Sequence, residues 1–397
     1  MNAIARKGFC PTLFSPMESG DGLLVRVRPP RGVFAAAAAR TLAAAAQLHG
    51  NGVIELTNRA SLQLRGLRAD TVAPFATEMV AAGLAHPDPA AERRRAVIAP
   101  PLADRRAADI VRAMEDMLVR EKGLAALPGK FGVLVDAGGA LPTGAAAADI
   151  RVMLTASTSP MLLLDGSDVA APCDPADIAG AVAQLAFAFA ALCGWHRRMR
   201  ALVAEVGAEA VFAAAGLQPS ATVALPAAPI ALGPLPGAFG IGLPFGATDA
   251  PTLCALAGLA DAFGDGTLRM TPWRAFVIAG VTASEDLRAS VAALGLIVGP
   301  DDARARISAC PGMPFCASAS VPTRSDAARL AQCGVTGSVH VSGCAKGCAH
   351  PAAADLTLVG DAGRYAIVRH GRAGDAPTRA GLTMSDALDL LREGIPA

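Results

Sequence analysis

Residues 25–67 read VRVRPPRGVFAAAAARTLAAAAQLHGNGVIELTNRASLQLRGL, and a related stretch, FGIGLPFGATDAPTLCALAGLADAFGDGTLRMTPWRAFVIAGV, occupies residues 239–281. The two align without a gap, and the matched positions include residues that fix turns: Pro30 with Pro244, Gly32 with Gly246, Gly50 with Gly264, Gly52 with Gly266, Thr57 with Thr271 and Gly66 with Gly280. Alanine-rich segments can match by chance, but chance would not preserve this punctuation. The sequence therefore predicts an internal duplication with one shared backbone path.

Each copy has the pattern strand, turn, helix, turn, strand. In the first copy we expect a strand at 23–28, a helix at 34–48 that stops at glycines 50–52, and alternation with period two over 53–65. The polar face of that last segment carries Thr57, Arg59, Ser61, Gln63 and Arg65, whereas the equivalent face of the second copy carries Thr271, Trp273, Ala275, Val277 and Ala279. A solvated strand face is the simple interpretation. The asymmetry favours one ligand pocket, in the first copy.

The rest of the chain suggests further domains, since 397 residues exceed one ordinary core. An α/β segment follows each copy, and the two segments echo each other at Asp149-Ile150 and Asp355-Leu356. The expected boundaries are 1–75 and 239–299 for the duplicated units, 88–217 and 300–397 for the α/β domains, and 218–238 for a linker rich in proline, alanine and glycine.

Composition excludes several classes of partner. The formal net charge is +1, so no global field would attract nucleic acid or an acidic membrane. The most apolar stretch, residues 178–195, is mostly alanine and glycine and runs into His196-Arg197-Arg198, so we expect a buried helix rather than a membrane span. The N-terminus lacks a signal-peptide pattern, and we expect a cytoplasmic protein.

Four of the nine cysteines form two close pairs. Cys310 and Cys316 lie in ACPGMPFCAS, and Cys344 and Cys348 lie in SGCAKGCAHP. Four thiolates with small neighbouring residues are what a [4Fe–4S] cluster needs, one per iron. Structural zinc and disulfides are the alternatives; zinc knuckles usually have other spacings, and the expected compartment disfavours disulfides. Cys10, Cys173, Cys193, Cys254 and Cys333 are interpreted as small buried hydrophobic residues.

Together these motifs resemble the nitrite/sulfite reductase superfamily over nearly the whole chain. The C-x5-C and SGC-x3-C pairs, followed by an Asp-Leu-x-Leu-x-Gly strand ending at Gly360, are similar to that superfamily's cluster segment. Thr57, Arg59 and Gln63 match its T-x-R-x-x-x-Q motif, Arg95 resembles its second arginine motif, and LPGKF at 127–131 matches L-P-x-K-F. The resemblance implies an α+β, internally duplicated fold of two ferredoxin-like half-domains plus two α/β domains.

Within the superfamily the details are most similar to the precorrin-3B synthase branch. The segment from Arg6 to Gly32 and the SGCAKGCAHP segment resemble that branch. Sirohaem reductases carry a second lysine in K-F-K, where this chain has Gly132. That lysine helps to protonate the bound oxyanion, so its absence argues against a sirohaem nitrite or sulfite reductase, which is the first alternative. A non-catalytic iron–sulfur electron-transfer protein is the second.

The resemblance implies an oxidoreductase, an O2-dependent monooxygenase that hydroxylates precorrin-3A and closes a lactone in cobalamin biosynthesis. Electrons would come from a separate donor, and Cys348 aligns with the thiolate that bridges cluster and sirohaem in the reductases. The tetrapyrrole would occupy the sirohaem pocket, so that sirohaem is expected only in the reductase alternative. Its carboxylates would bind Arg59, Gln63, Arg65, Arg95 and Lys130, with catalytic roles for Arg59, Arg95 and Lys130. An additional mononuclear iron is conceivable on His340 and His350, although a lone histidine more often makes a structural hydrogen bond.

Overall fold

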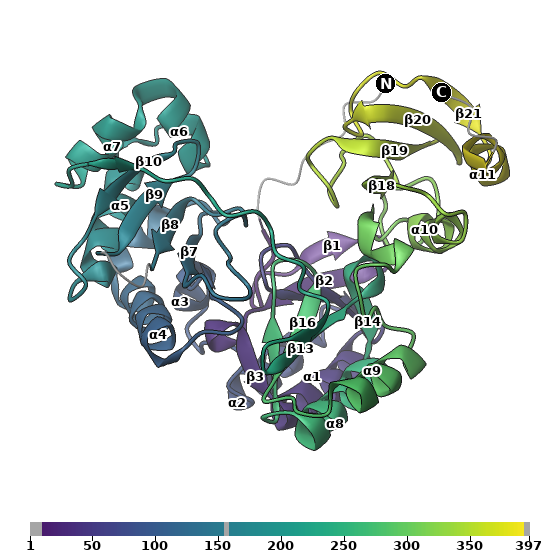
Figure 1. Cartoon of the computed structure of the whole chain (residues 1–397), viewed down its shortest axis with the longest axis horizontal. Helices are drawn as coiled ribbons and strands as arrows, with labels where there is room; N and C mark the ends of the chain where they lie inside the picture. Colours follow the sequence, from purple (N-terminus) through teal and green to yellow (C-terminus); the bar gives the residue numbers. More distant parts are fainter. Residues whose placement is uncertain (1–9, 155–158, 393–397) are drawn as a thin grey trace.

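The computed structural model describes residues 10–154 and 159–392. Its described part forms three regions around four sheets, and the duplicated units join at the base of the view in Figure 1. The expected positions Arg6 to Phe9 lie outside the described residues. None of the helices in the described ranges has the length and apolar character needed to cross a membrane.

The first duplicated unit forms a five-stranded sheet that includes one strand from the second unit. The order is β1 (Met17–Ser19), β2 (Gly22–Val27), β5 (Leu62–Leu67), β4 (Val53–Leu56) and β14 (Ala247–Asp249). The second sheet repeats this order with β12 (Gly233–Leu235), β13 (Ala238–Gly242), β16 (Ala275–Ala279), β15 (Thr267–Met270) and β3 (Val33–Ala35). Each unit therefore contributes one strand to the sheet of the other. The segment 218–238, expected to be a linker, contains two short strands, β11 (Ala221–Thr222) and β12.

The backbone of the two copies follows the same path. Arg31 and Phe245 have φ of 57° and 56°, and Ala60 and Arg274 have φ of 46° and 59°, at equivalent positions. Left-handed backbone is costly for residues with a Cβ, so its recurrence at matched positions is strong support for duplication. The exchange is symmetric too, because Ala36 N–H bonds the Gly266 carbonyl at 2.8 Å and Ala250 N–H bonds the Gly52 carbonyl at 3.0 Å.

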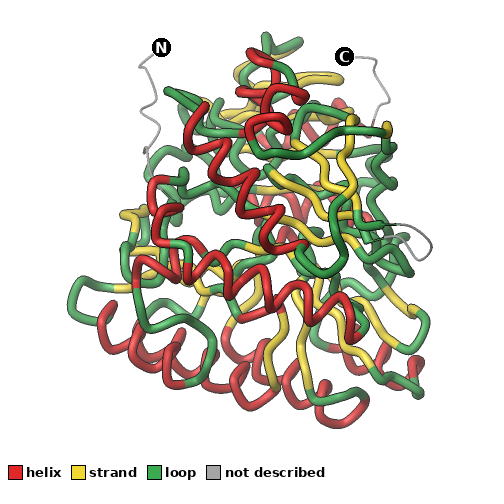
Figure 2. Tube along the Cα trace, turned by 90° about the vertical axis from the view of Figure 1, so that its left-hand side faces the viewer, coloured by secondary structure: helices red, strands yellow, loops and turns green. Residues whose placement is uncertain are grey.

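Helices of both units cover one side of the two sheets, and they lie along the bottom of Figures 1 and 2. They are α1 (Ala36–His49), α2 (Val72–Ala81), α8 (Ala250–Phe263) and α9 (Ser284–Ala293). Their apolar faces share a single hydrophobic core with the sheets, to which Leu42, Ile54, Leu256 and Phe276 contribute. Burying such side chains contributes roughly 1.5–3 kcal/mol each, so the two units stabilise each other.

The segment 53–65 is a hairpin rather than one strand. β4 ends at Leu56 and β5 begins at Leu62, with a turn closed by Thr57 N–H to the Ser61 carbonyl at 2.9 Å. Period-two alternation cannot reveal this turn, because the tight reversal keeps even positions in the core on both strands. The consequence is functional: Arg59 lies at the tip of a turn, whereas Gln63 and Arg65 lie within the sheet.

The first α/β domain has three parallel strands continued by antiparallel ones. Its sheet runs β6 (Val97–Ile98), β7 (Val133–Asp136), β8 (Ile150–Met153), β9 (Met161–Leu164), β10 (Val169–Pro172) and β11, and its helices are α3 (Pro89–Arg94), α4 (Arg105–Arg120), α5 (Ile178–Leu192), α6 (Met199–Val206) and α7 (Ala208–Ala214). The stretch expected to form a buried helix is α5, with Val182, Leu185 and Phe189 in the core.

The second α/β domain repeats this arrangement. Its sheet runs β17 (Ile307–Ala309), β18 (Val339–Ser342), β19 (Ala354–Asp361), β20 (Arg364–Gly371) and β21 (Arg379–Leu382), with α10 (Thr323–Ala331) and α11 (Met384–Arg392) packed on it. The first three strands are parallel and the rest antiparallel, as in the other domain. The Asp149-Ile150 and Asp355-Leu356 echo falls at the start of the third strand in each sheet.

Candidate active site

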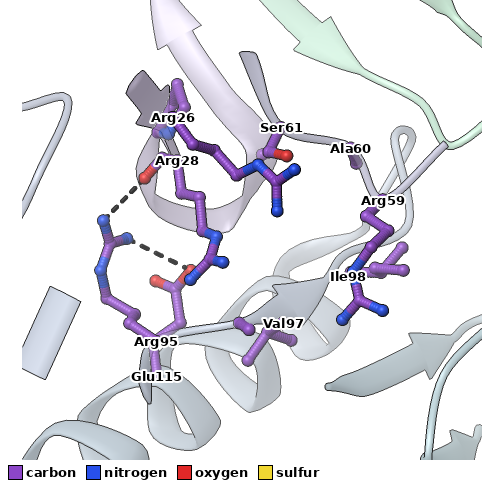
Figure 3. Close-up of a pocket in the computed structure, with 12 residues that line it drawn as sticks. Arg26, Arg28, Arg59, Ala60, Ser61, Arg95, Val97, Ile98 and Glu115 are labelled. Atoms are coloured by element: carbon purple, nitrogen blue, oxygen red, sulfur yellow. Dashed lines mark hydrogen bonds and ion pairs between the residues drawn. The ribbon is translucent and has the colours of Figure 1, made fainter. Parts of the chain in front are cut away.

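A cationic pocket lies where the first sheet meets the first α/β domain. Figure 3 shows it, with side chains converging from β2, the β4–β5 turn, β6 and α4. The charged lining residues are Arg26, Arg28, Arg59, Arg95 and Glu115. The cavity volume is about 20 Å³, enough for a water molecule or the end of a carboxylate but not for a macrocycle. The pocket can therefore grip only a peripheral group of a large ligand.

Arg59 is the least compensated cation of this pocket. Its guanidinium has no hydrogen-bond acceptor or ion-pair partner among the described residues. Burial, together with the neighbouring Arg198 and Arg28, lowers the pKa of Arg59 to about 10, although Asp149 acts in the opposite direction. A half-buried arginine with two arginines and only one carboxylate acting on it is a favourable site for an anion. The turn thus presents Arg59 as a carboxylate-binding group.

Arg95 has a different environment from Arg59. It is 5% exposed, and its Nη2 atom bonds the carboxylate of Glu92 at 2.8 Å and the Arg28 carbonyl at 2.6 Å. Its Nη1 lies 3.6 Å from Oε1 of Glu115, whose pKa is raised by burial. These contacts make Arg95 a support of the pocket wall, while Nε and Nη1 still lack hydrogen-bond partners. The structure thus brings together Arg59 and Arg95 of the predicted set.

Two further arginines of the pocket escaped the sequence prediction. Arg26 and Arg28 alternate with valines in VRVR, so β2 projects both toward the pocket side while Val25 and Val27 enter the core. Burial lowers the pKa of Arg28 to about 10, and Arg26 contributes in the same direction. The period-two arginine pattern next to Pro29 was the available signal.

The remaining predicted residues are dispersed. Gln63 accepts a hydrogen bond from Arg26 Nη2 at 2.7 Å and so lies behind the pocket lining. Lys130 is exposed and does not line the pocket. At Gly132, two residues further, an added Cβ would lie 2.8 Å from Nη2 of Arg59. A side chain at position 132 would thus meet the guanidinium of Arg59.

The geometry is at odds with the substrate-binding prediction for Arg65. Arg65 is 3% exposed, and Nε and Nη2 bond the carboxylate of Asp21, each at 3.0 Å. It also bonds the Phe315 carbonyl and lies 3.5 Å from Oε2 of Glu55. Because its donors are already used, Arg65 anchors the cysteine loop to the sheet instead of facing a ligand. Sequence alternation placed it on the polar face without showing what covers that face.

The four paired cysteines lie together in the second α/β domain. Cys310 is buried, Cys316 and Cys344 are half-buried, and Cys348 is exposed. Burial raises the pKa of Cys344 and of Cys348, and both also respond to the thiols of Cys310 and Cys316. Loops that lie on different strand ends therefore bring all four sulfur atoms within electrostatic range of one another.

The four thiols match a [4Fe–4S] cluster in the number and kind of donor atoms. Within the described ranges, no group of three or more histidine, cysteine or acidic side chains is arranged to hold a metal ion. A cubane binds one thiolate per iron, so its thiols stand further apart than those around one zinc. Gly343 N–H donates to Cys310 Sγ at 3.2 Å, and a Cβ at Gly343 would lie 2.6 Å from the Ala319 Cβ. The backbone at Gly343 therefore lies directly against Ala319 and Cys310.

His340 lies beneath the loop that carries Cys344 and Cys348. It is fully buried in β18, both ring nitrogens lack partners among the described residues, and its ring centroid is 5.8 Å from that of His350. Burial lowers the pKa of His340 to about 4, so the ring is neutral near pH 7. Two imidazoles alone are an incomplete ligand set, so a mononuclear iron here stays a prediction.

Comparison with known proteins agrees with this architecture. Residues 15–82 and 237–294 match the nitrite/sulfite reductase ferredoxin-like half domain. The Mycobacterium tuberculosis NirA protein shares the fold, with a TM-score of 0.72 and 21% identity over 93% of this chain and 79% of that chain. The duplicated fold is thus that of the nitrite/sulfite reductase superfamily. A Sinorhizobium sp. precorrin-3B synthase is 34% identical over 399 residues, covering 95% of this chain and 85% of that protein. The chain belongs to the precorrin-3B synthase family, which confirms the resemblance noted from the motifs.

Proposed function

We propose that this chain hydroxylates precorrin-3A with O2 and closes a lactone onto the product, in the aerobic route to cobalamin. Membership of the precorrin-3B synthase family supports the reaction. The observation that carries the assignment to this pocket is the guanidinium of Arg59, which has no hydrogen-bond or ion-pair partner among the described residues. It lies near Arg28 in a cavity large enough for a water molecule or the end of a carboxylate. A tetrapyrrole with acetate and propionate side chains presents the complementary groups.

The proposed role of the pocket is to orient the macrocycle. A carboxylate held by Arg59 and Arg28 would fix one edge of the ring and leave its face free. Arg95 would hold the wall through Glu92 and Glu115. Lys130 is exposed, so we assign it a weaker and solvent-screened contribution to attracting the substrate.

We further propose that Cys310, Cys316, Cys344 and Cys348 hold a [4Fe–4S] cluster. When bound, it supplies one-electron transfer between an external donor and the reaction site. The overall reaction balances when one oxygen atom of O2 enters the substrate and the other leaves as water, with two electrons and two protons supplied. A separate reduced electron-transfer protein is the expected source of those electrons.

The nearest rival is a sirohaem reductase. Gly132 opposes it, because by the resemblance it stands where sirohaem reductases carry the second lysine of K-F-K, which helps to protonate the bound oxyanion. The two functions are separated by anaerobic purification followed by single-turnover assays. We expect iron and sulfide without sirohaem, and O2 uptake that requires both precorrin-3A and an electron source. Near one sirohaem per chain, with sulfite- or nitrite-dependent turnover, would overturn the proposal.

A further inference from the structure

Glu55 is a buried carboxylate that connects the pocket with the cysteine loops. It is 5% exposed and lies on β4, on the face opposite to Ile54 and Leu56 of the core. It accepts hydrogen bonds from Gln63 Nε2 at 3.0 Å and from the guanidinium of Arg324. Burial would raise the pKa of Glu55, but Arg324 and Arg65 outweigh it and hold the pKa below its usual value. Glu55 is thus ionised.

Toward the pocket, the path from Glu55 is short and runs across neighbouring strands. Gln63 lies directly opposite Glu55 on β4 and opposite Arg26 on β2. Cross-strand neighbours share one face of the sheet, so their polar ends meet. Gln63 donates to Glu55 and accepts from Arg26 at 2.7 Å, which orients its amide unambiguously. Arg26 then lines the pocket itself.

Toward the cysteines, the path from Glu55 divides into two arginines. Arg65 donates to the carbonyl of Phe315, the residue before Cys316, and that carbonyl also accepts from Ser19 Oγ at 2.8 Å and from Gly20 N–H at 3.1 Å. A Cβ at Gly20 would lie 2.6 Å from the Pro314 carbonyl, so the loop is packed directly on the sheet.

Arg324 connects Glu55 with Cys310, the other cysteine of the Cys310–Cys316 pair. It follows Thr323 at the start of α10, and the Thr323 hydroxyl donates to the Cys310 carbonyl at 2.5 Å. The same oxygen lies 3.8 Å from Cys310 Sγ. Each arginine that touches Glu55 therefore acts within one residue of a cysteine or of a direct cysteine contact. One carboxylate joins two anchors of the proposed cluster to one wall of the pocket.

We propose that Glu55 is a positioning residue that couples the redox state of the cluster to substrate binding in the arginine pocket. This inference rests on the proposed function for the identity of the substrate, but not for its effect on the cluster. The charge of Glu55 offsets Arg324 and Arg65 beside the cysteine loops. Its loss leaves net positive charge there, which stabilises the reduced cluster and raises its midpoint potential. Loss of Arg324 has the opposite sign.

The coupling has a reciprocal consequence. If substrate binds the oxidised and reduced protein with different affinities, substrate must shift the midpoint potential by the same free energy. Gln63 carries this coupling without carrying charge. Gln63→Leu should therefore leave the resting potential unchanged and abolish the shift caused by substrate, whereas Glu55→Gln should alter both.

The experiment is an anaerobic redox titration of the purified holoprotein, followed by electron paramagnetic resonance, with and without precorrin-3A. We expect a raised potential in Glu55→Gln, a lowered one in Arg324→Gln, and substrate affinity weakened about tenfold in Glu55→Gln, the change that corresponds to one lost net interaction. Asp165→Asn is the matched control, since Asp165 is a buried carboxylate paired with Arg151 and Arg200 in the other α/β domain.

Unchanged potentials in Glu55→Gln and Arg324→Gln, or shifts of the same sign, would overturn the proposal. A substrate-induced shift that survives in Gln63→Leu would overturn the coupling path. If Glu55→Gln fails to fold, Arg324→Gln and Gln63→Leu test the two arms separately. Wild-type protein that neither binds nor converts precorrin-3A would instead refute the proposed function, while the resting potentials would still report on Glu55.

Discussion

Arg59 lies where a side chain at position 132 would begin: a Cβ on Gly132 would lie 2.8 Å from Nη2 of Arg59. The two residues come from different domains, the β4–β5 turn and the start of the β7 segment. Gly132 N–H also donates to Asp149 at 3.0 Å, which fixes its backbone. Because the backbone cannot retreat, the arginine must move when a side chain is added. The side chain chosen at position 132 therefore controls where the guanidinium of Arg59 can lie.

The first prediction follows from that contact. Gly132→Ala should displace Arg59 and weaken substrate binding about tenfold or more, the cost expected for a charge-assisted contact of roughly 1.5–3 kcal/mol. Gly129→Ala is the control, since its added Cβ would lie 3.7 Å from Cys10 Cβ, an ordinary contact. Equilibrium binding and thermal unfolding should be measured on both. Equal affinity in the two variants would contradict the contact's role.

The second prediction compares equivalent turn positions of the two copies. Arg59→Ala should weaken binding by about 10- to 150-fold with the cluster content intact. Trp273→Ala should cost mainly stability, because Trp273 packs on an apolar cluster with Leu141 and Val277. Lys130→Ala should have a smaller effect than Arg59→Ala, since an exposed charge is screened. Full activity in Arg59→Ala, or catalytic loss without destabilisation in Trp273→Ala, would show that the pocket has been assigned to the wrong copy of the duplicated unit.

The third prediction concerns the metal content. Anaerobically purified protein should contain about four iron and four sulfide per chain. Cys316→Ser or Cys344→Ser should lose both together, while Cys254→Ser, at an exposed cysteine on α8, should retain them. Iron, sulfide and zinc should be measured on the same samples. Stoichiometric zinc without sulfide would exclude a cluster.

The fourth prediction is a pH dependence from His340. Its pKa is about 4 in the folded protein, against an ordinary value of 6.5, because burial disfavours the charged ring. Between these values the unfolded chain binds more protons, so stability is full above pH 6.5 and falls as the pH drops toward 4. The loss of unfolding free energy has an upper limit of about 3.4 kcal/mol, from about 1.36 kcal/mol per pKa unit.

His340→Leu should flatten the dependence of stability on pH. The measurement is the urea midpoint of unfolding, followed by circular dichroism from roughly pH 4.5 to 7.5, where the two protonation states of the histidine differ most between folded and unfolded chains. The exposed His370 provides the control through His370→Asn, since asparagine tolerates the left-handed backbone found there. A slope in His340→Leu as steep as that of wild type would show that another group governs the acid response.

The duplication could be predicted from local sequence, because the residues that fix its turns are recognisable one by one. Glycines such as Gly52 and Gly266, with φ of 77° and 73°, mark turns that few other residues tolerate, so their spacing encodes the backbone path. The turn at 57–61 was not predicted, because the alternation of apolar residues continues from one strand of the hairpin to the other. The structural role of Arg65 was not predicted for another reason. A strand pattern shows which face of the sheet a side chain occupies, but not which distant loop covers that face.

By itself, the sequence determined the repeat, the α+β class and the four paired cysteines, since turn residues and thiol spacing are local properties of the chain. Only the tertiary structure decided that β3 and β14 are exchanged between the copies and that Arg26 and Arg28 join Arg59 in one pocket. It also decided that Glu55 lies between that pocket and the cysteine loops. These contacts join residues up to about 270 positions apart, and their partners are chosen by sheet register and domain packing, which no local pattern records.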